Sequence, residues 1–319
     1  MIYPWHQKQL KQLRDQLKQE RLPHALLFEG PVGMGKLNFA ESFSQEVLCE
    51  KHRENGCGVC RSCELLAVGN HPDYFRIYPE EESKAIKVQQ VRDLIDELSQ
   101  HSHQGHYQVA IISPADSMNR AASNALLKTL EEPVGKVLII LVTNRMHVLP
   151  ATVVSRCQKI QFLNPPAEIT QSWLSQSLGT REGLDFLLSS ADQAPLKALE
   201  LAQANYQELR DQVLSQLIGI KSNEVNAVKL ASQWSKLDLD ALIKILQSLL
   251  MDLIRLNFEV DFKYLFNSDH IQKLLELKDS ATLDHWFQVL KELLRVRELF
   301  LSSNNVNQQM LLESFLLKL

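Results

Sequence analysis

A glycine-rich stretch, Gly30-Pro31-Val32-Gly33-Met34-Gly35-Lys36, constrains this chain more than any other feature. An apolar run at 25–28 precedes it and a segment with helical periodicity follows it, which is the strand, turn and helix order of a phosphate-binding loop. The backbone N–H groups of such a loop, together with the positive end of the helix, attract an anion. The sequence therefore predicts one of two structures, a glycine-rich turn kept for packing or a phosphate cradle built from Gly30, Gly33, Gly35 and Lys36.

The next position, Leu37, stands where a functional loop of this kind carries Ser or Thr. That hydroxyl coordinates the magnesium ion bound to the nucleotide's phosphates, and a leucine side chain offers no oxygen. The strand expected at 107–112 also lacks a carboxylate at its end, because a short turn separates it from Asp116, which we expect to be a helix N-cap or a turn residue. The loop is therefore suited to hold phosphate and poorly suited to hydrolyse it.

Four of the five cysteines lie between positions 49 and 63, with the spacing Cys49-x7-Cys57-x2-Cys60-x2-Cys63. Four thiolates at these distances can close a tetrahedral shell, so we expect structural Zn²⁺ with all four as ligands and no open position for catalysis. An iron–sulfur cluster is less favoured because no Cys-Pro pair follows Cys63, and a metal-free group of thiols stays open. His52 and His71 lie nearby and are not counted as ligands.

Composition limits the remaining classes of function. The chain has 319 residues, enough for two or three domains, and 45% of them are apolar. Lys and Arg number 34 against 38 Asp and Glu, a net charge of −4, so no overall basic field indicates nucleic-acid binding. No apolar run approaches the length of a membrane span, and the first residues lack the apolar segment of a signal peptide. We therefore expect a soluble cytoplasmic protein that does not associate with membranes.

Helical and strand patterns alternate up to residue 164, which predicts a parallel sheet. The expected strands are 25–28, 73–78, 107–112, 137–142 and 159–162, and the first helix is expected to run from Trp5 to about Arg21, where Pro23 closes it. Asn164-Pro165-Pro166 ends the pattern, because consecutive prolines continue neither a helix nor a strand. The rest of the chain has helical periodicity, strongest in the leucine stripe from Leu239 to Leu256.

Taken together, four motifs resemble those of bacterial DNA polymerase III clamp-loader subunits, which belong to the AAA+ class. They are the loop 30–36, the cysteine insertion 49–63, Asn124-Ala-Leu-Leu-Lys-Thr-Leu-Glu-Glu-Pro133 and Ser155-Arg156-Cys157. The resemblance covers the whole chain. It implies an α/β AAA+ nucleotide-binding-like domain with a zinc module at 1–164, a small helical lid at 165–205 and a helical collar at 206–319.

Within that family the chain resembles the delta-prime type of subunit rather than the ATP-hydrolysing gamma/tau type. Alignment on 124–133 places the family's Asp-Glu pair at Pro114 and Ala115, neither of which can hold magnesium. Leu196 stands where active subunits carry a nucleotide-sensing arginine. The resemblance therefore implies a subunit without polymerase or ATPase activity of its own, whose loop holds ATP weakly or not at all.

One functional residue of the family, the arginine of its Ser-Arg-Cys motif, is present in this chain as Arg156. In the family, the arginine of Ser-Arg-Cys reaches across a subunit interface to the phosphates of ATP bound by a neighbour; the alternative is an arginine paired with a local carboxylate. The implied role is a non-hydrolysing stator in a five-subunit loader with gamma/tau and delta. Such a loader opens the sliding clamp and places it on primed DNA.

Two other functions stay open. The chain can be an ATPase in its own right, of gamma/tau type, that uses Lys36 and Asp116. It can also be a zinc-dependent DNA-binding module, although the segment 57–63 carries only Arg61 as a base and no aromatic residue for stacking.

Overall fold

The computed structural model describes residues 2–51, 54–80, 83–99, 102, 107–222, 224–302 and 307–319. His52, considered above beside the cysteines, lies outside these residues. The chain forms two compact units, Met1–Ile169 and Thr170–Leu319, and each is described by itself. Among the described helices, none is long and apolar enough to cross a membrane.

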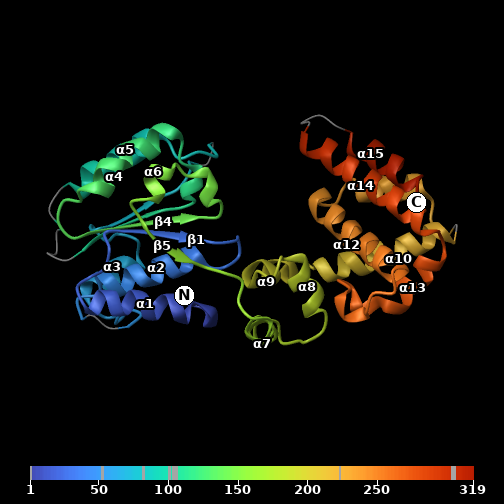
Figure 1. Cartoon of the computed structure of the whole chain (residues 1–319), viewed down its shortest axis with the longest axis horizontal. Helices are drawn as coiled ribbons and strands as arrows, with labels where there is room; N and C mark the ends of the chain where they lie inside the picture. The colour runs from blue at the N-terminus through green and yellow to red at the C-terminus, as the bar shows by residue number, and fades with distance from the viewer. Residues whose placement is uncertain are drawn as a thin grey trace. The chain divides into compact units, whose positions relative to one another are not determined.

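The first unit is built on a parallel five-stranded sheet with the order β2-β3-β4-β1-β5 (Figure 1). Its strands are β1 (Ala25–Glu29), β2 (Tyr74–Ile77), β3 (Gln108–Ile112), β4 (Val137–Thr143) and β5 (Gln158–Gln161). Every residue of β1, β3 and β4 is buried, as expected for central strands of a parallel sheet that is covered on both faces. The five predicted strands are confirmed, with small differences at their ends.

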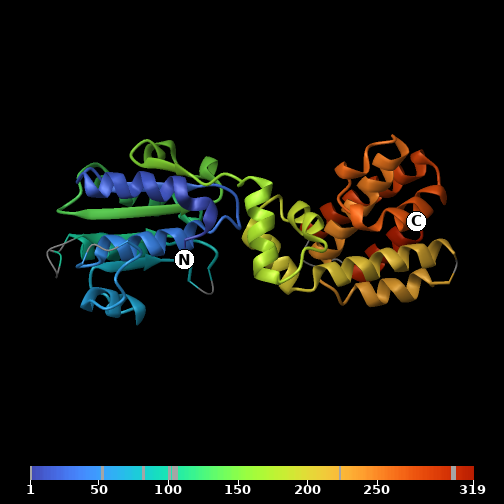
Figure 2. The ribbon, with the colours of Figure 1, turned by 90° about the horizontal axis from the view of Figure 1, so that it is seen from below.

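Helices cover both faces of this sheet (Figures 1 and 2). Helices α4 (Val88–Leu98), α5 (Arg120–Glu131) and α6 (Ala151–Val154) lie on one face, and α1 (Gln7–Lys18), α2 (Lys36–Leu48) and α3 (Arg61–Ala67) lie on the other. Successive side chains of a strand point to opposite faces, so Leu27 packs in the cluster that contains α4 and α5, whereas the ring of Phe28 lies 5.5 Å from that of Phe39 in α2.

The first helix differs from its prediction. Residues Pro4–His6 form a 3-10 turn, and α1 ends at Lys18, before the proline that was expected to stop it. The reason is a local cap: Glu20 has a φ of +54°, and the N–H of Arg21 donates to the carbonyl of Gln16 at 2.8 Å. A left-handed residue with this bond pattern ends a helix without any proline.

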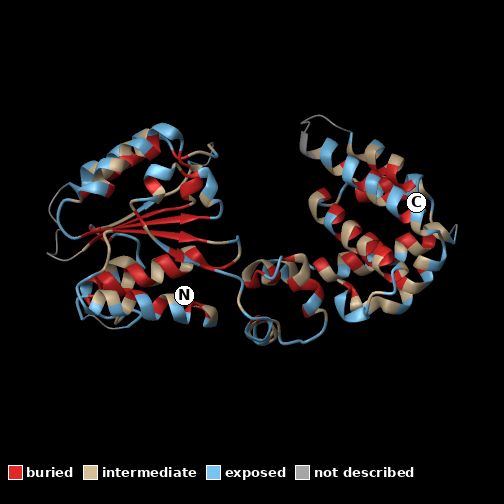
Figure 3. Ribbon diagram, viewed as in Figure 1, coloured by how far each residue is buried: buried red, intermediate tan, exposed pale blue. Residues whose placement is uncertain are grey.

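The described residues of the second unit contain helices and no strand, which confirms the predicted α/β-then-all-α organisation. The α-helices are α7 (Ala167–Leu178), which begins at the end of the first unit, α8 (Leu184–Ser190), α9 (Pro195–Gln203), α10 (Tyr206–Lys221), α11 (Ala227–Trp234), α12 (Leu239–Asn257), α13 (Ile271–Asp279), α14 (Leu283–Ser302) and α15 (Gln308–Leu316). Figure 3 shows the buried face of α12, where the predicted leucine stripe forms intramolecular core. Side chains of α7, α8 and α9 form a separate hydrophobic cluster. The lid and collar boundary near residue 205 stays a prediction.

Candidate functional site

The glycine-rich loop connects β1 to α2, as predicted, and two of its glycines, Gly30 and Gly35, are needed for close packing. Gly30 has a φ of +151°, and a Cβ added there would lie 2.1 Å from the carbonyl oxygen of Phe162. Gly35 has a φ of +76°, and its Cβ would lie 2.7 Å from the ring of Tyr3. The N-terminal segment also binds the loop, because Trp5 Nε1 and His6 Nε2 both donate to the carbonyl of Met34, at 3.1 and 2.8 Å. The loop is therefore a tightly packed turn.

We expect Gly30→Ala to lower the free energy of unfolding by about 2–4 kcal/mol, because the new methyl group meets a backbone carbonyl and the left-handed φ adds strain. Gly135→Ala is the matched control, since Gly135 has a φ of +76° with no atom within 4 Å of the added Cβ. Its cost is the backbone strain alone, about 1–2 kcal/mol. Urea unfolding of the three proteins measures both effects. Equal losses in the two variants would contradict the packing role of Gly30.

Lys36 is buried at the foot of the loop, with its ammonium held by oxygens of the protein. Nζ donates to the carbonyls of Gly30 and Pro31, at 2.7 and 2.5 Å, and to Oδ1 of Asn144 at 2.8 Å. An ammonium has three protons, and these contacts use all of them. Burial lowers the pKa of Lys36 to about 8, although the charge of Asp116 opposes the shift. A phosphate can reach this ammonium only by displacing one of its present partners.

Because the pKa of Lys36 is lowered in the folded state, Lys36 makes the free energy of unfolding depend on pH. Between about pH 8 and the ordinary value of 10.5, the folded state binds fewer protons at Lys36 than the unfolded state does, so stability rises with pH through this window. We expect the free energy of unfolding of the wild type, minus that of Lys36→Met, to increase from pH 8 to pH 10. Chemical denaturation across this range checks the sign. A difference that stays flat, or that falls as pH rises, would contradict it.

The carboxylate of Asp116 lies beside the loop and is hydrogen-bonded to other groups of the protein. It accepts from Thr143 Oγ1 at 2.9 Å, from the N–H of Asn144 at 3.2 Å and from Arg145 Nε at 2.9 Å. Burial opposes ionisation, but these hydrogen bonds outweigh it and hold the pKa of Asp116 below its usual range. Asp116 lies in the 3-10 turn Ala115–Ser117, whose N-cap residue is Pro114, so of the two expected roles it has the turn and not the N-cap.

Sequence reasoning assigned no role to Asn144, which the structure places against Lys36. The signal was available in part, because Asn144 directly follows a buried strand, and side chains at the carboxyl ends of neighbouring parallel strands lie close together. What the sequence did not reveal is that β4 lies next to β1 in the sheet.

Arg156 follows α6, and its guanidinium contacts its own chain. Nε donates to Oε1 of Glu131 at 2.7 Å, Nη2 donates to the same carboxylate, and Nη1 donates to the carbonyl of Thr152 at 2.8 Å. The side chains of Arg156 and Glu131 are 32% and 50% exposed. The local carboxylate considered as the alternative is therefore present, and it is Glu131, at the end of the motif 124–133. An ion pair this exposed contributes only about 0–1 kcal/mol, so a stronger anion can displace it.

The four predicted cysteines come together on the face of the sheet that carries α2. The sulfur atoms of Cys49, Cys57, Cys60 and Cys63 all lie within 4.8 Å of one another, and this group of four could hold a metal ion. Cys57 Sγ accepts from the N–H of Cys60 at 3.3 Å, and Cys60 Sγ accepts from that of Cys63 at 3.4 Å. Backbone N–H groups, that of Val59 foremost, lower the pKa of Cys57 to about 6, whereas burial raises the pKa of Cys63. Four sulfurs in this arrangement fit a closed tetrahedral site.

Ion pairs and hydrogen bonds around the buried carboxylate of Glu46 connect the segment between the first two cysteines to the body of the unit. Arg14 of α1 donates to both carboxylate oxygens of Glu46, at 2.9 Å each, and to Glu54 at 2.8 Å. Glu46 also accepts from the N–H of Asn55 at 3.1 Å. Sequence reasoning missed this arrangement, because its members come from α1, α2 and a loop.

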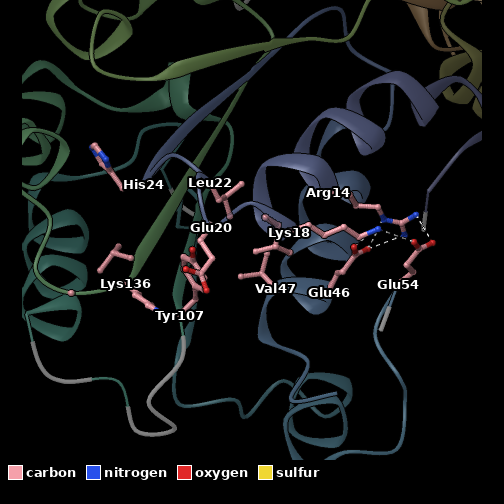
Figure 4. Close-up of a pocket in the computed structure, with 13 residues that line it drawn as sticks. Arg14, Lys18, Glu20, Leu22, His24, Glu46, Val47, Glu54, Tyr107 and Lys136 are labelled. Carbon is pink, nitrogen blue, oxygen red and sulfur yellow. Dashed lines mark hydrogen bonds and ion pairs between the residues drawn. The ribbon is translucent and has the colours of Figure 1, made fainter. Parts of the chain in front are cut away.

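Arg14, Glu46 and Glu54 line one end of a cavity of about 580 Å³, shown in Figure 4. His24, Tyr107 and Lys136 at its other end lie next to the amino ends of β1, β3 and β4. The phosphate-type loop follows the carboxyl end of β1, where parallel sheets bind their ligands. The cavity lies at the amino ends of these strands, and Arg14 is paired with Glu46 and Glu54. We therefore assign no ligand to the cavity.

Known proteins resemble this chain along nearly all of its length. The family "DNA polymerase III, delta subunit" matches residues 5–166, and "DNA polymerase III, delta subunit, C terminal" matches residues 203–319. DNA polymerase III subunit delta' of Pseudomonas aeruginosa is 33% identical and covers 99% of this chain and 97% of the relative. The delta' subunit of Yersinia pestis is 32% identical, covering 99% and 94%. DNA polymerase III subunit tau of Bacillus subtilis is 32% identical, but that match covers 60% of this chain and 35% of the relative.

Proposed function

This chain belongs to the delta-prime family of DNA polymerase III clamp-loader subunits, and from that premise we propose that it is the non-hydrolysing stator of its loader. Gamma/tau and delta subunits would complete the five-subunit ring that opens the sliding clamp and places it on primed DNA. The α/β unit would be its AAA+ domain. Helices α7 to α9 would form the lid, and the helices from residue 206 onward would form the collar that holds the ring.

The observation that carries the proposal is that the chain's own groups occupy its phosphate-type loop. All three protons of the Lys36 ammonium are used by protein oxygens. Asp116, the acid that an active enzyme would need for magnesium, accepts hydrogen bonds from three neighbours instead. Leu37 and Pro114 offer no metal ligand. This arrangement favours a stator over the rival reading of an independent ATPase.

The active contribution of the chain would be Arg156, acting in trans on ATP held by a neighbouring subunit. A planar guanidinium binds phosphate oxygens through two parallel hydrogen bonds and stabilises the charge that develops as the phosphoryl group is transferred. Glu131 holds this guanidinium through an exposed ion pair, which a phosphate can replace because the pair contributes little free energy.

The four-cysteine cluster would hold one Zn²⁺ through Cys49, Cys57, Cys60 and Cys63. A zinc ion with four thiolate ligands has no open position, so its contribution is to the stability of the fold and not to catalysis. The closeness of the four sulfurs and the backbone N–H groups directed at them support this assignment.

A comparison of the lone chain with the reconstituted loader tests the stator. We expect no magnesium-dependent ATP hydrolysis by the isolated chain, and unchanged DNA-stimulated hydrolysis when a loader is assembled with Lys36→Ala in this subunit. Turnover by the isolated chain that Lys36→Ala abolishes would establish the independent ATPase and overturn the stator. Gel filtration of each complex is the control, because it shows that the ring has assembled.

A further inference from the structure

A serine and a histidine without a role in the proposed function lie beside the cysteine cluster. Ser62 stands between Cys60 and Cys63 and is fully buried, and His71 is 6% exposed. Ser62 Oγ lies 2.6 Å from the carbonyl oxygen of Leu48 and 2.8 Å from Nε2 of His71. The two side chains thus belong to one buried chain of hydrogen bonds.

The partners of each group fix the direction of these bonds. Nδ1 of His71 accepts from the N–H of Asp73 at 3.1 Å, so this nitrogen carries no proton. The one proton of the neutral ring is therefore on Nε2, which donates to Ser62 Oγ. The Ser62 hydroxyl in turn donates to the Leu48 carbonyl, which can only accept. Since one ring nitrogen accepts and the other donates, neither is available to a metal, which agrees with the exclusion of His71 from the ligands.

This chain of bonds reaches both halves of the cluster and the edge of the sheet. Leu48 is the last residue of α2 and immediately precedes Cys49, while Ser62 lies in the first turn of α3 with Cys63 next to it. His71 is anchored by Asp73, whose own carbonyl accepts from the N–H of Val109 in β3 at 2.9 Å. The bonds therefore set the position of Cys49 relative to Cys63, and of both relative to the sheet.

We propose that Ser62 and His71 are positioning residues that hold the four cysteines in their metal-binding arrangement. The proposal rests on the proposed function in one respect, that the cluster holds a metal. Removal of the Ser62 hydroxyl takes from the Leu48 carbonyl and the His71 N–H the partner that each has among the described residues, which disfavours the arrangement that the metal needs. Loss of hydrogen bonds around a metal site weakens binding by about 10–100-fold.

The test measures metal affinity on the whole chain. The protein is freed of metal under reducing conditions and titrated with Co²⁺, whose absorption reports tetrahedral thiolate ligation, and Zn²⁺ competition then gives the zinc affinity. We expect Ser62→Ala and His71→Phe each to weaken zinc by about tenfold or more. Because both act through one chain of bonds, the double variant should lose much less than the product of the two single effects. His71→Gln retains an N–H donor and should recover part of the loss.

Arg61→Ala is the matched control, because Arg61 stands between the same two cysteines as Ser62 and is exposed. It should bind zinc like the wild type. If Ser62→Ala and His71→Phe bind zinc with wild-type affinity, the positioning role is wrong and the metal site is unaffected. If the wild-type chain binds neither Co²⁺ nor Zn²⁺, the positioning role and the metal site are both wrong. If His71→Phe does not fold, His71→Asn decides, since its shorter side chain does not reach Ser62; unchanged zinc affinity there overturns the proposal.

Discussion

Arg156→Ala in a reconstituted loader is expected to reduce hydrolysis about 10³-fold or more at the ATP site that receives this side chain, and so to remove much of the DNA-stimulated turnover of the whole complex. The reason is that a guanidinium supplied in trans stabilises charge that exists only in the transition state. Arg156→Lys should not restore the rate, because a lysine keeps the charge but lacks the planar fork that binds two phosphate oxygens. Steady-state ATPase assays with primed DNA measure both variants.

Glu131→Gln is the companion variant that separates the proposed role in trans from a local one. It removes the ion pair that Arg156 makes with its own chain and leaves the guanidinium in place. Because an exposed pair of this kind contributes about 0–1 kcal/mol, we expect stability and turnover close to those of the wild type. If the complex with Arg156→Ala assembles and hydrolyses ATP normally, Arg156 is a structural residue and the chain is a scaffold only.

Removal of zinc is expected to unfold the cysteine module while the sheet stays folded. The reason is one of magnitude, because structural zinc can supply about 10–16 kcal/mol of apparent binding free energy in small domains. Each hydrogen bond that ties the module to the rest of the unit contributes only about 0.5–1.5 kcal/mol. Chelation should release one zinc per chain. Hydrogen exchange should then become fast in the segment 49–67 and remain slow in β1 and β4, whose residues are all buried.

Cysteine substitutions provide the controls for this experiment. Cys63→Ser should lose the zinc without a chelator, because it removes one of four thiolates. Cys157→Ser should retain it, because Cys157 lies outside the cluster and burial raises its pKa to about 11, so it stays a thiol. Zinc retained by Cys63→Ser, or a chain that keeps slow exchange at 49–67 after chelation, would contradict a structural metal at these residues.

Features that depend on neighbouring residues in the chain could be predicted from the sequence. The central strands are continuous apolar runs, so their positions were clear, and the cysteines were recognisable because their spacing is local. The end of α1 was predicted wrongly, because Glu20 takes the left-handed conformation that usually indicates glycine. In the sequence, Pro23 was the stronger signal for where this helix ends.

Contacts between distant residues account for what the sequence did not reveal. Lys36 meets Asn144 only because β1 and β4 are neighbours, and strand order is a property of the folded sheet. The pairing of Arg156 with Glu131 depends in the same way on the packing of α6 against α5. The sequence therefore did not reveal the contacts that hold Lys36 and Arg156 in place.

The strand order also determines when this chain can fold as it leaves the ribosome. β1 is among the first elements to be synthesised, yet both of its neighbours in the sheet, β4 and β5, begin only at Val137 and Gln158. Until then the apolar residues of β1 have no strand to pair with, and such exposed segments aggregate easily. The four cysteines lie within 49–63, so a metal bound to them would link this segment before β4 and β5 are synthesised. The nascent chain would then hold a metal-bound segment before it has a complete sheet.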